Sequence, residues 1–270
     1  TEGTINRNST PYYCNRFYDY FGEGNELKCL GYHGNANVIY ALQESCNVFF
    51  YEVGRLLGIN KMNQYSELYG LGQKTGIEIG ESTGILAGPA QRSAAGGIWT
   101  AGDTVQAAIG QSDNAFTPIQ LAAYTMTIAN DGVRYKTHLV DSIHHYDGTV
   151  EKIEPEVAAR VSFTQEAIDA VREGMIRVVT DGTASSAFSR GNVGYTVAAE
   201  TGTAQNSTNR SDHGTFIAYA PVEDPEVAIA VVMENGTSRP AADVGRAVLD
   251  AYFAAKTQSQ GPTVPGELLP

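Results

Sequence analysis

Cysteine is scarce in this sequence. The 270 residues contain 3 cysteines, and no two of them form a C-x-x-C pair. This number is too small for a disulfide framework, and the missing pair argues against a structural zinc site, so we expect neither a metal nor a cofactor. A disulfide between Cys14 and Cys29 is one arrangement that an oxidising environment would permit. Cys46 falls in a helical stretch, where we expect it to be buried.

Basic residues and long apolar runs are scarce as well. Lysine and arginine number 18 against 30 acidic residues, which gives a formal net charge of -12. Because a phosphate backbone is bound by lysine and arginine, this balance argues against nucleic acid as a partner. No apolar run approaches the ~20 residues that a membrane helix needs, and residues 1–21 lack the core of a signal peptide. Any export signal or membrane anchor is therefore expected upstream of Thr1.

The composition is that of a folded globular chain. Hydrophobic residues make up 42% and charged residues 18% of the sequence, which argues against disorder and suits one large α/β unit. Residues 1–34 are rich in turns and show no clear period. From Asn35 to Leu57, apolar residues recur at steps of three and four, which predicts two helices meeting at the polar junction "ESCN".

Two further helices have clear signals. The better marked one covers residues 117–132, with Thr117 at the N-cap, Pro118 at the first helical position and "NDG" as the stop. The second covers residues 162–182, is amphipathic and carries acidic residues in its first turn. A shorter helix is expected over 62–72, followed by a glycine-rich loop over 75–89.

The last third of the chain alternates as strands do. Segments 195–205, 214–222 and 227–236 read as strands, and the short turn "EDPE" predicts that the last two are antiparallel neighbours. We also expect a hairpin over 133–152, with His144 and His145 beside its turn, and a closing helix over 242–256. The layout predicts an α/β (α+β) fold in which an antiparallel sheet is packed by helices and preceded by a helical lobe. We expect residues 1–256 to form the domain and residues 257–270, rich in proline and glycine, to form a mobile tail.

Two motif matches are decoys. "GESTG" over residues 80–84 fits the nucleophile-elbow pattern, which requires a strand before the serine and a helix directly after it. The sequence "ILAGP" follows instead, so Ser82 is predicted to be a loop residue. "KTG" at Lys74 to Gly76 leads into the same glycine-rich loop and is predicted to lie outside any sheet.

Two other segments carry more information. "SCN" (Ser45-Cys46-Asn47) stands at the helix junction, and by residue type alone Ser45 or Asn47 would cap the second helix. "AAETGTAQ" (residues 198–205) ends a strand in small hydroxylated residues that can line a binding cleft. The order of the two, with "YGLGQKTGIEIGESTGILAGP", "AIGQSDNAFTPIQLAAYTMTIANDG" and "FIAYAPVEDPEVAIAVVMENG" around them, resembles the transpeptidase domain of penicillin-binding proteins, closest to the monofunctional (class B) type. The resemblance runs from about Gly31 to Phe253.

The resemblance implies a β-lactamase/D,D-peptidase-like fold and a peptidoglycan D,D-transpeptidase. In this family a serine of the motif S-x-x-K attacks the D-Ala-D-Ala end of a stem peptide, and penicillins (β-lactams) acylate the same serine; S-x-N and K-T-G complete the site. By resemblance, Ser45 relays protons and Asn47 holds the substrate amide. Thr201 and Thr203 bind the substrate carboxylate, and Gly202 keeps the strand edge low enough for the peptide to approach. A glycosyltransferase of cell-wall synthesis is the expected partner, and the extracytoplasmic face of the bacterial membrane is the expected location.

The sequence departs from the family pattern at two points. It contains no S-x-x-K, which is expected upstream of Thr1 together with the first strands and the nucleophile helix. The residues given are therefore predicted to be inactive alone, and to expose apolar surface that another chain or a dimer exchange would complete.

The second departure is Glu200, which stands at the lysine position of K-T-G. Two like charges ~5 Å apart repel by about 3 kcal/mol at an effective dielectric of 20, so an ionised Glu200 should damage the carboxylate site. The alternative is that the strand is shifted or that Glu200 points to solvent. This residue also favours a second reading of the chain, a non-catalytic binding or scaffolding module related to penicillin-binding proteins.

Overall fold

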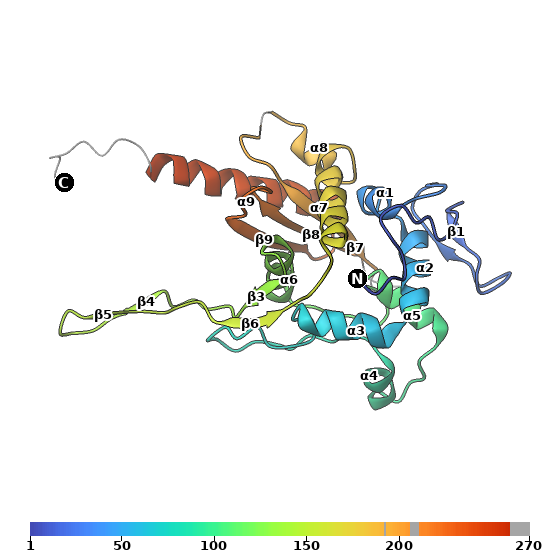
Figure 1. Cartoon of the computed structure of the whole chain (residues 1–270), viewed down its shortest axis with the longest axis horizontal. Coiled ribbons are helices and arrows are strands. Elements are labelled where there is room, and N and C mark those ends of the chain that lie inside the picture. Colours follow the sequence, from blue (N-terminus) through green and yellow to red (C-terminus); the bar gives the residue numbers. More distant parts are fainter. Residues whose placement is uncertain (192, 206–210, 260–270) are drawn as a thin grey trace.

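The computed structural model describes residues 1–191, 193–205 and 211–259. Figure 1 shows the chain as a helical lobe beside a sheet covered by helices. The helices are α1 (Val38–Gln43), α2 (Asn47–Leu57), α3 (Ile59–Leu68), α4 (Pro89–Ala94), α5 (Ala101–Ala108), α6 (Pro118–Ala129), α7 (Gln165–Thr180), α8 (Ser185–Phe188) and α9 (Ser238–Ser259). The strands are β1 (Phe17–Tyr18), β2 (Leu27–Lys28), β3 (Val133–Tyr135), β4 (Ser142–His144), β5 (Val150–Lys152), β6 (Val157–Arg160), β7 (Ala198–Ala204), β8 (His213–Ala220) and β9 (Val227–Met233).

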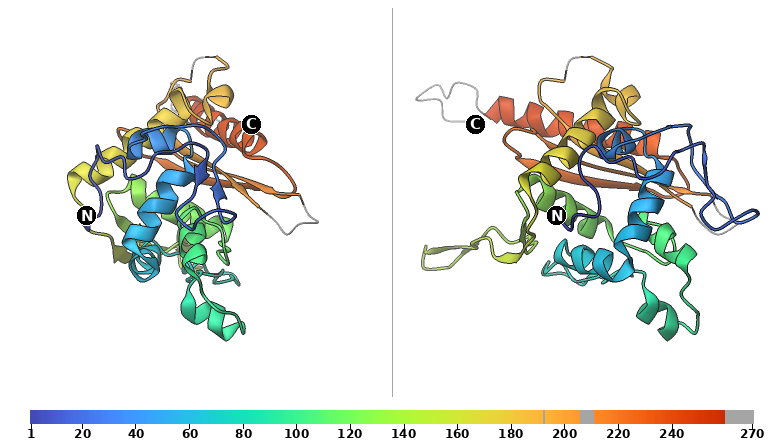
Figure 2. Two further views of the ribbon diagram at one scale, coloured as in Figure 1. Left: turned by 90° about the vertical axis from the view of Figure 1, so that its right-hand side faces the viewer. Right: turned by 45° about the vertical axis from the view of Figure 1, so that its right-hand side comes forward.

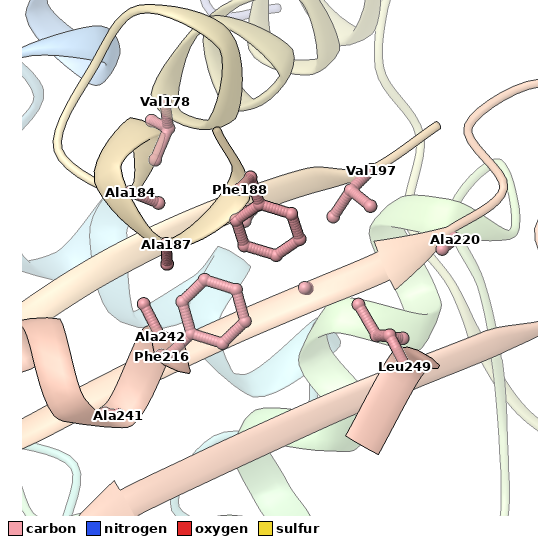
Figure 3. Close-up of a cluster of buried hydrophobic side chains, with 12 residues drawn as sticks. Val178, Ala184, Ala187, Phe188, Val197, Phe216, Ala220, Ala241, Ala242 and Leu249 are labelled. Atoms are coloured by element: carbon pink, nitrogen blue, oxygen red, sulfur yellow. The ribbon is translucent and has the colours of Figure 1, made fainter. Parts of the chain in front are cut away.

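The central sheet has the order β7-β8-β9, and both pairs are antiparallel. This confirms the predicted pairing across "EDPE" and the predicted α/β architecture. Side chains alternate between the two faces, as the two-residue period of a strand requires. On one face Phe216 packs with Phe188 of α8 and Leu249 of α9 (Figure 3), and on the other Tyr219 packs with Ile128 of α6. The sheet therefore lies between α9 and α6, as Figure 2 shows.

The predicted helix boundaries agree with the structure where the sequence contains a capping residue. The Thr117 side chain accepts a hydrogen bond from the Gln120 backbone N–H, and the Gln120 side-chain oxygen accepts one from the Thr117 backbone N–H, so both hydrogen bonds of this capping box form. Thr164 caps α7 in the same position. The run from Asn35 to Leu57 divides into α1 and α2, as predicted.

Residues 133–152 do not form the single hairpin that we predicted. β3 pairs with β6, and β4 pairs with β5, so one hairpin lies within a longer one. The inner pair projects far from the body of the molecule (Figure 1), and His145 N donates to Thr149 O across its turn at 2.9 Å. Residues 133–152 do contain strands, but the first of them, β3, pairs with β6, which lies after this segment.

Other elements of the structure differ from the prediction as well. α4 and α5 were not predicted, although Thr100 and Asp103 form a capping box at the start of α5. α9 begins and ends outside the predicted 242–256, and residues 260–270 of the predicted tail lie outside the described residues. Ser82 and Lys74 lie in the loop between α3 and α4, which confirms that neither belongs to a sheet strand or an elbow.

Part of the apolar surface is exposed, as we expected. Val244, Val248 and Tyr252 recur at four-residue steps along α9, and Val232 lies on the edge strand β9. Among the described residues, none of the helices is long and apolar enough to cross a membrane.

Candidate active site and metal centre

The junction between α1 and α2 faces the strand β7. Ser45 adopts a left-handed backbone conformation (φ 50°) between the two helices, which few residues other than glycine and asparagine favour. Its Oγ donates a hydrogen bond to Glu200 Oε1 at 2.9 Å, across 155 positions of sequence. The structure thus brings Ser45 and the strand that carries Glu200 together.

Glu200 points inward and not to solvent, so the alternative of a solvent-facing side chain is wrong. The residue is partly exposed, but its Oε2 is buried and has no hydrogen-bond partner among the described residues. Burial raises the pKa of Glu200 to about 8, against the opposing effect of hydrogen bonds from the Ser45 hydroxyl and the Thr201 backbone N–H. At neutral pH the carboxyl group is therefore mostly the neutral acid.

Tyr124 of α6 is an ionisable neighbour of Glu200. Burial raises the pKa of Tyr124, and its electrostatic interaction with Tyr69 and Glu200 raises it further. The same two tyrosines, with Ile128, line an apolar cavity of about 290 Å³. Neither tyrosine carries a positive charge, so Tyr124 does not favour the charged form of the Glu200 carboxyl group.

The rest of the strand motif lies on an open edge. In the described part of the chain, β7 pairs with β8 alone, which leaves the outer edge of β7 for another extended segment. Thr203 is exposed, and its carbonyl accepts from Gln111 Nε2 at 3.5 Å. Thr201 is buried, and its Oγ1 shares a hydrogen bond of 2.7 Å with Thr183 Oγ1.

Gly202 meets a constraint that the sequence did not indicate. A Cβ atom at this position would lie 2.3 Å from Oγ1 of Thr215 on β8, which is the residue directly opposite in the register. The glycine therefore makes room within the sheet itself. Its expected part in letting a peptide approach remains a prediction.

Neither Ser45 nor Asn47 caps α2, so that interpretation was wrong. The N-cap residue is Cys46, and it makes no side-chain capping bond. Asn47 is the first residue of the helix, and its Nδ2 donates to Lys28 O at 3.3 Å. Both polar side chains of "SCN" are thus directed at other segments, Ser45 at β7 and Asn47 at the N-terminal loops.

Cys46, between them, belongs to a four-residue cluster that sequence reasoning missed. One ligand atom each from Cys14, Cys29, His33 and Cys46 lies within 4.8 Å of all the others. His33 Nδ1 is 3.5 Å from Cys14 Sγ and 3.4 Å from Cys29 Sγ. Tetrahedral zinc with Zn–S bonds of about 2.3 Å holds its ligand atoms about 3.8 Å apart, and three thiolates with one imidazole are a common zinc ligand set. The side chains present therefore fit Zn²⁺.

The thiols of this cluster are free. All three cysteines are unpaired and buried, so a Cys14–Cys29 disulfide is absent and the expected burial of Cys46 is confirmed. A hydrogen bond from Cys46 holds the pKa of the Cys29 thiol well below its usual range. A thiolate is the form that binds a metal. The sequence hid the site because its ligands come from two loops and a helix junction, without the short C-x-x-C spacing.

The comparisons with known proteins give the family. A model described as the penicillin binding protein transpeptidase domain matches residues 2–252. The chain belongs to this family. Among its relatives, the peptidoglycan D,D-transpeptidase MrdA of Acinetobacter baumannii is 32% identical over 244 residues, which cover 84% of this chain and 36% of the relative. Penicillin-binding protein 2A of Bacillus subtilis is 31% identical over 262 residues, which cover 83% of this chain and 35% of the relative.

Solved structures agree with this assignment. The crystal structure of Pseudomonas aeruginosa PBP2 in complex with WCK 5153 superposes with a TM-score of 0.80 at 26% identity, over 97% of this chain and 57% of that one. The complex of PBP2 and MreC from Helicobacter pylori gives a TM-score of 0.78 at 28% identity, over 93% of this chain and 46% of that one. The fold is that of penicillin-binding transpeptidases. The chain spans about a third of the length of the curated relatives, 36% and 35% for the two above.

Proposed function

We propose that the protein containing this chain is a peptidoglycan D,D-transpeptidase, which cross-links stem peptides through a serine acyl-enzyme and binds β-lactams. Its relatives carry this activity in their names. In this role Ser45 relays protons, Asn47 holds the substrate amide, and Thr201 and Thr203 bind the terminal carboxylate. We also propose that the protein acts at the extracytoplasmic face of the bacterial membrane with a glycosyltransferase of cell-wall synthesis.

The observation that carries this proposal is the contact between Ser45 Oγ and Glu200 Oε1 at 2.9 Å. It supports the proposal because the Ser45 hydroxyl, the group proposed to relay protons, lies beside a strand whose outer edge is open in the described residues. An extended peptide that adds to such an edge gains backbone hydrogen bonds, and its reacting carbonyl then lies near the helix junction. Acyl transfer needs this combination of a positioned peptide and a proton relay.

Glu200 favours a second candidate, a penicillin-binding-protein-like module that binds or scaffolds without catalysis. The position that carries lysine in K-T-G holds a carboxyl group here, and its Oε2 is buried without a hydrogen-bond partner in the described residues. Loss of the cation removes an attraction for a substrate carboxylate. The two candidates differ in one measurable property, covalent reaction with a β-lactam.

A fluorescent penicillin distinguishes them. We expect the full-length protein to become covalently labelled, and its labelled serine, identified by peptide mass spectrometry, to lie in an S-x-x-K motif. The 270-residue chain alone has no such motif and is expected to remain unlabelled in the same assay. A full-length protein that is folded but never labelled would support the non-catalytic module.

We further propose that Cys14, Cys29, His33 and Cys46 bind a structural Zn²⁺ ion. The proposal rests on the convergence of their ligand atoms within 4.8 Å and on the match of the ligand types to zinc. Because Cys46 stands between Ser45 and Asn47, a bound ion would fix the junction that carries both side chains. Such an ion would position these two residues.

A further inference from the structure

Thr183 lies in the loop between α7 and α8, in contact with the cleft strand β7. Its Oγ1 is 2.7 Å from Oγ1 of Thr201, and either hydroxyl can be the donor in this hydrogen bond. The two threonines differ in their access to solvent, because Thr183 is exposed whereas Thr201 keeps only 8% of its surface exposed. A ligand in the cleft therefore has access to Thr183 that it lacks to Thr201.

Burial decides the direction of this hydrogen bond. If Thr183 donated, the hydrogen of the Thr201 hydroxyl would need a second acceptor, and the part of the chain that the structure describes offers none. A buried donor without an acceptor is costly. With Thr201 as the donor, its hydrogen is paired, and the free hydrogen belongs to the exposed hydroxyl of Thr183. The pair thus presents one free O–H donor to solvent.

The loop that carries Thr183 is fixed against the end of α1. Thr183 N donates to Gln43 O at 3.3 Å, and Gln43 is the last residue of α1, two positions before Ser45. Gly182 lies so close to the same carbonyl group that a Cβ atom there would be 2.2 Å from Gln43 O. The position of the Thr183 hydroxyl is therefore set by the junction that also carries Ser45.

Ser45 and Thr183 lie on opposite faces of β7. Glu200, which accepts from Ser45, and Thr201, which pairs with Thr183, are consecutive residues of this strand. Successive side chains of a strand point to opposite faces, and the outer edge of β7 is unpaired in the described residues. An extended ligand that lies along this edge therefore has the Ser45 side chain on one face of the strand and the free hydroxyl donor on the other.

We propose that Thr183 is a binding residue of the cleft, whose hydroxyl donates to the terminal carboxylate of the ligand while it accepts from Thr201. The ligand class, a peptide with a free terminal carboxylate or a β-lactam, rests on the proposed function. A hydroxyl that accepts one hydrogen bond is polarised into a stronger donor for the next, and a donor paired with a carboxylate makes a charge-assisted hydrogen bond. Thr201 thus acts on the ligand through Thr183.

The first experiment measures the second-order rate constant for labelling of the full-length protein by a fluorescent penicillin. Thr183→Val keeps the shape of the side chain and removes the hydroxyl. Because a hydrogen bond to a charged group contributes enough for about a tenfold change, we expect this variant to react about tenfold more slowly than the wild type. Thr183→Ser keeps the hydroxyl and should react within about twofold of the wild type.

Thr180→Val is the matched control for this experiment. Thr180 is an exposed threonine of the same segment, and its Oγ1 donates to Asp181 Oδ2 at 2.8 Å. Its substitution removes one hydroxyl at the end of α7 without touching the pair at β7, so the labelling rate should stay that of the wild type.

A second measurement requires no covalent reaction. Saturation-transfer NMR on the full-length protein compares the binding of a peptide that ends in D-Ala-D-Ala with that of its C-terminal amide. We expect the wild type to bind the free carboxylate about tenfold more tightly than the amide. Thr183→Val should bind the two peptides about equally.

Three results would overturn the inference: Thr183→Val is labelled as fast as the wild type, Thr183→Val and Thr183→Ser are slowed equally, or the wild type shows no preference for the free carboxylate. Failure of the proposed function gives a different result. If neither the wild type nor any variant is labelled, but the carboxylate preference is present in the wild type and lost in Thr183→Val, the transpeptidase proposal fails and the assignment of Thr183 stands.

Discussion

Two glutamates in this chain are enclosed by the fold, and their surroundings differ sharply. Glu52 of α2, in the N-terminal lobe, receives the hydroxyl of Tyr18 at 2.6 Å and two hydrogen bonds from Arg55, at 2.9 and 2.7 Å. Glu200, on the cleft strand, receives one hydroxyl at Oε1, and its Oε2 has no partner among the described residues. Burial opposes ionisation of both, yet the pKa of Glu52 is lowered and that of Glu200 is raised.

The difference teaches that partners decide the charge of a buried carboxyl group. At Glu52, hydrogen bonds from Arg55 and Tyr18 outweigh burial, and the group is a carboxylate that joins α2 to the loops of the lobe. At Glu200, the hydrogen bonds from one hydroxyl and one backbone N–H do not outweigh burial. A fully paired buried carboxylate contributes to stability, whereas a buried carboxyl group with an unpaired oxygen favours its neutral form. Three experiments test this division between lobe and cleft.

The largest effect is expected from removing metal from the lobe. A ligand present at 1,000 times its Kd stabilises the folded state by about 4 kcal/mol, which corresponds to roughly 10 °C in Tm for a chain of this size. We expect purified protein to contain one zinc per chain by mass spectrometry of the metal, and chelation to lower Tm by about 10 °C. Cys46→Ser should lose the zinc, while the control His144→Ala, on the projecting hairpin, should keep it. Full zinc content in Cys46→Ser would contradict the site.

The next effect concerns stability at Glu200. Its pKa in the folded chain is about 8, above the ordinary value of 4.5, so the folded state holds this proton more tightly than the unfolded state. The stabilisation is complete below pH 4.5 and is lost as the pH rises towards 8, at about 1.4 kcal/mol per pH unit. Glu200→Gln should abolish this slope, so that its unfolding free energy gains up to about 4 kcal/mol on the wild type between pH 5 and pH 8. Urea denaturation at a series of pH values measures it, and parallel curves would refute the buried neutral acid.

The smallest effect is expected at Arg55. Arg55→Ala gives Glu52 surroundings like those of Glu200, because the carboxyl group stays enclosed and has fewer hydrogen-bond partners. Because the arginine side chain is 30% exposed and that of Glu52 8%, we expect a loss of about 2 kcal/mol, less than for a fully buried pair. Arg177→Ala, which breaks a more exposed pair with Glu173, is the matched control and should cost less than about 1 kcal/mol. Equal losses in the two variants, measured by urea denaturation at pH 7, would show that the enclosure of Glu52 adds nothing.

Local patterns were enough to predict much of the fold. Caps and periodicity located α6 and α7, and alternation with short turns located β8 and β9, because these signals act within one element. They could not assign β3 to β6, whose pairing depends on a partner more than twenty residues away. The cysteine cluster was not predicted for the same reason, since its ligands come together only after the loops of residues 1–34 pack on α2. The family resemblance assigned Ser45 and Glu200 to one site, but the orientation and protonation of Glu200 depend on burial, which only the fold supplies.

The left-handed turn at Ser45 has a consequence for how the two sites communicate. Three successive side chains leave this turn for three different destinations: Ser45 for the strand, Cys46 for the sulfur cluster and Asn47 for the N-terminal loops. Because Ser45 and Asn47 are each one peptide unit from Cys46, a displacement of the Cys46 sulfur would shift both of them directly. Oxidation of Cys46, or loss of an ion bound to it, would therefore rotate the backbone that carries Ser45 and Asn47.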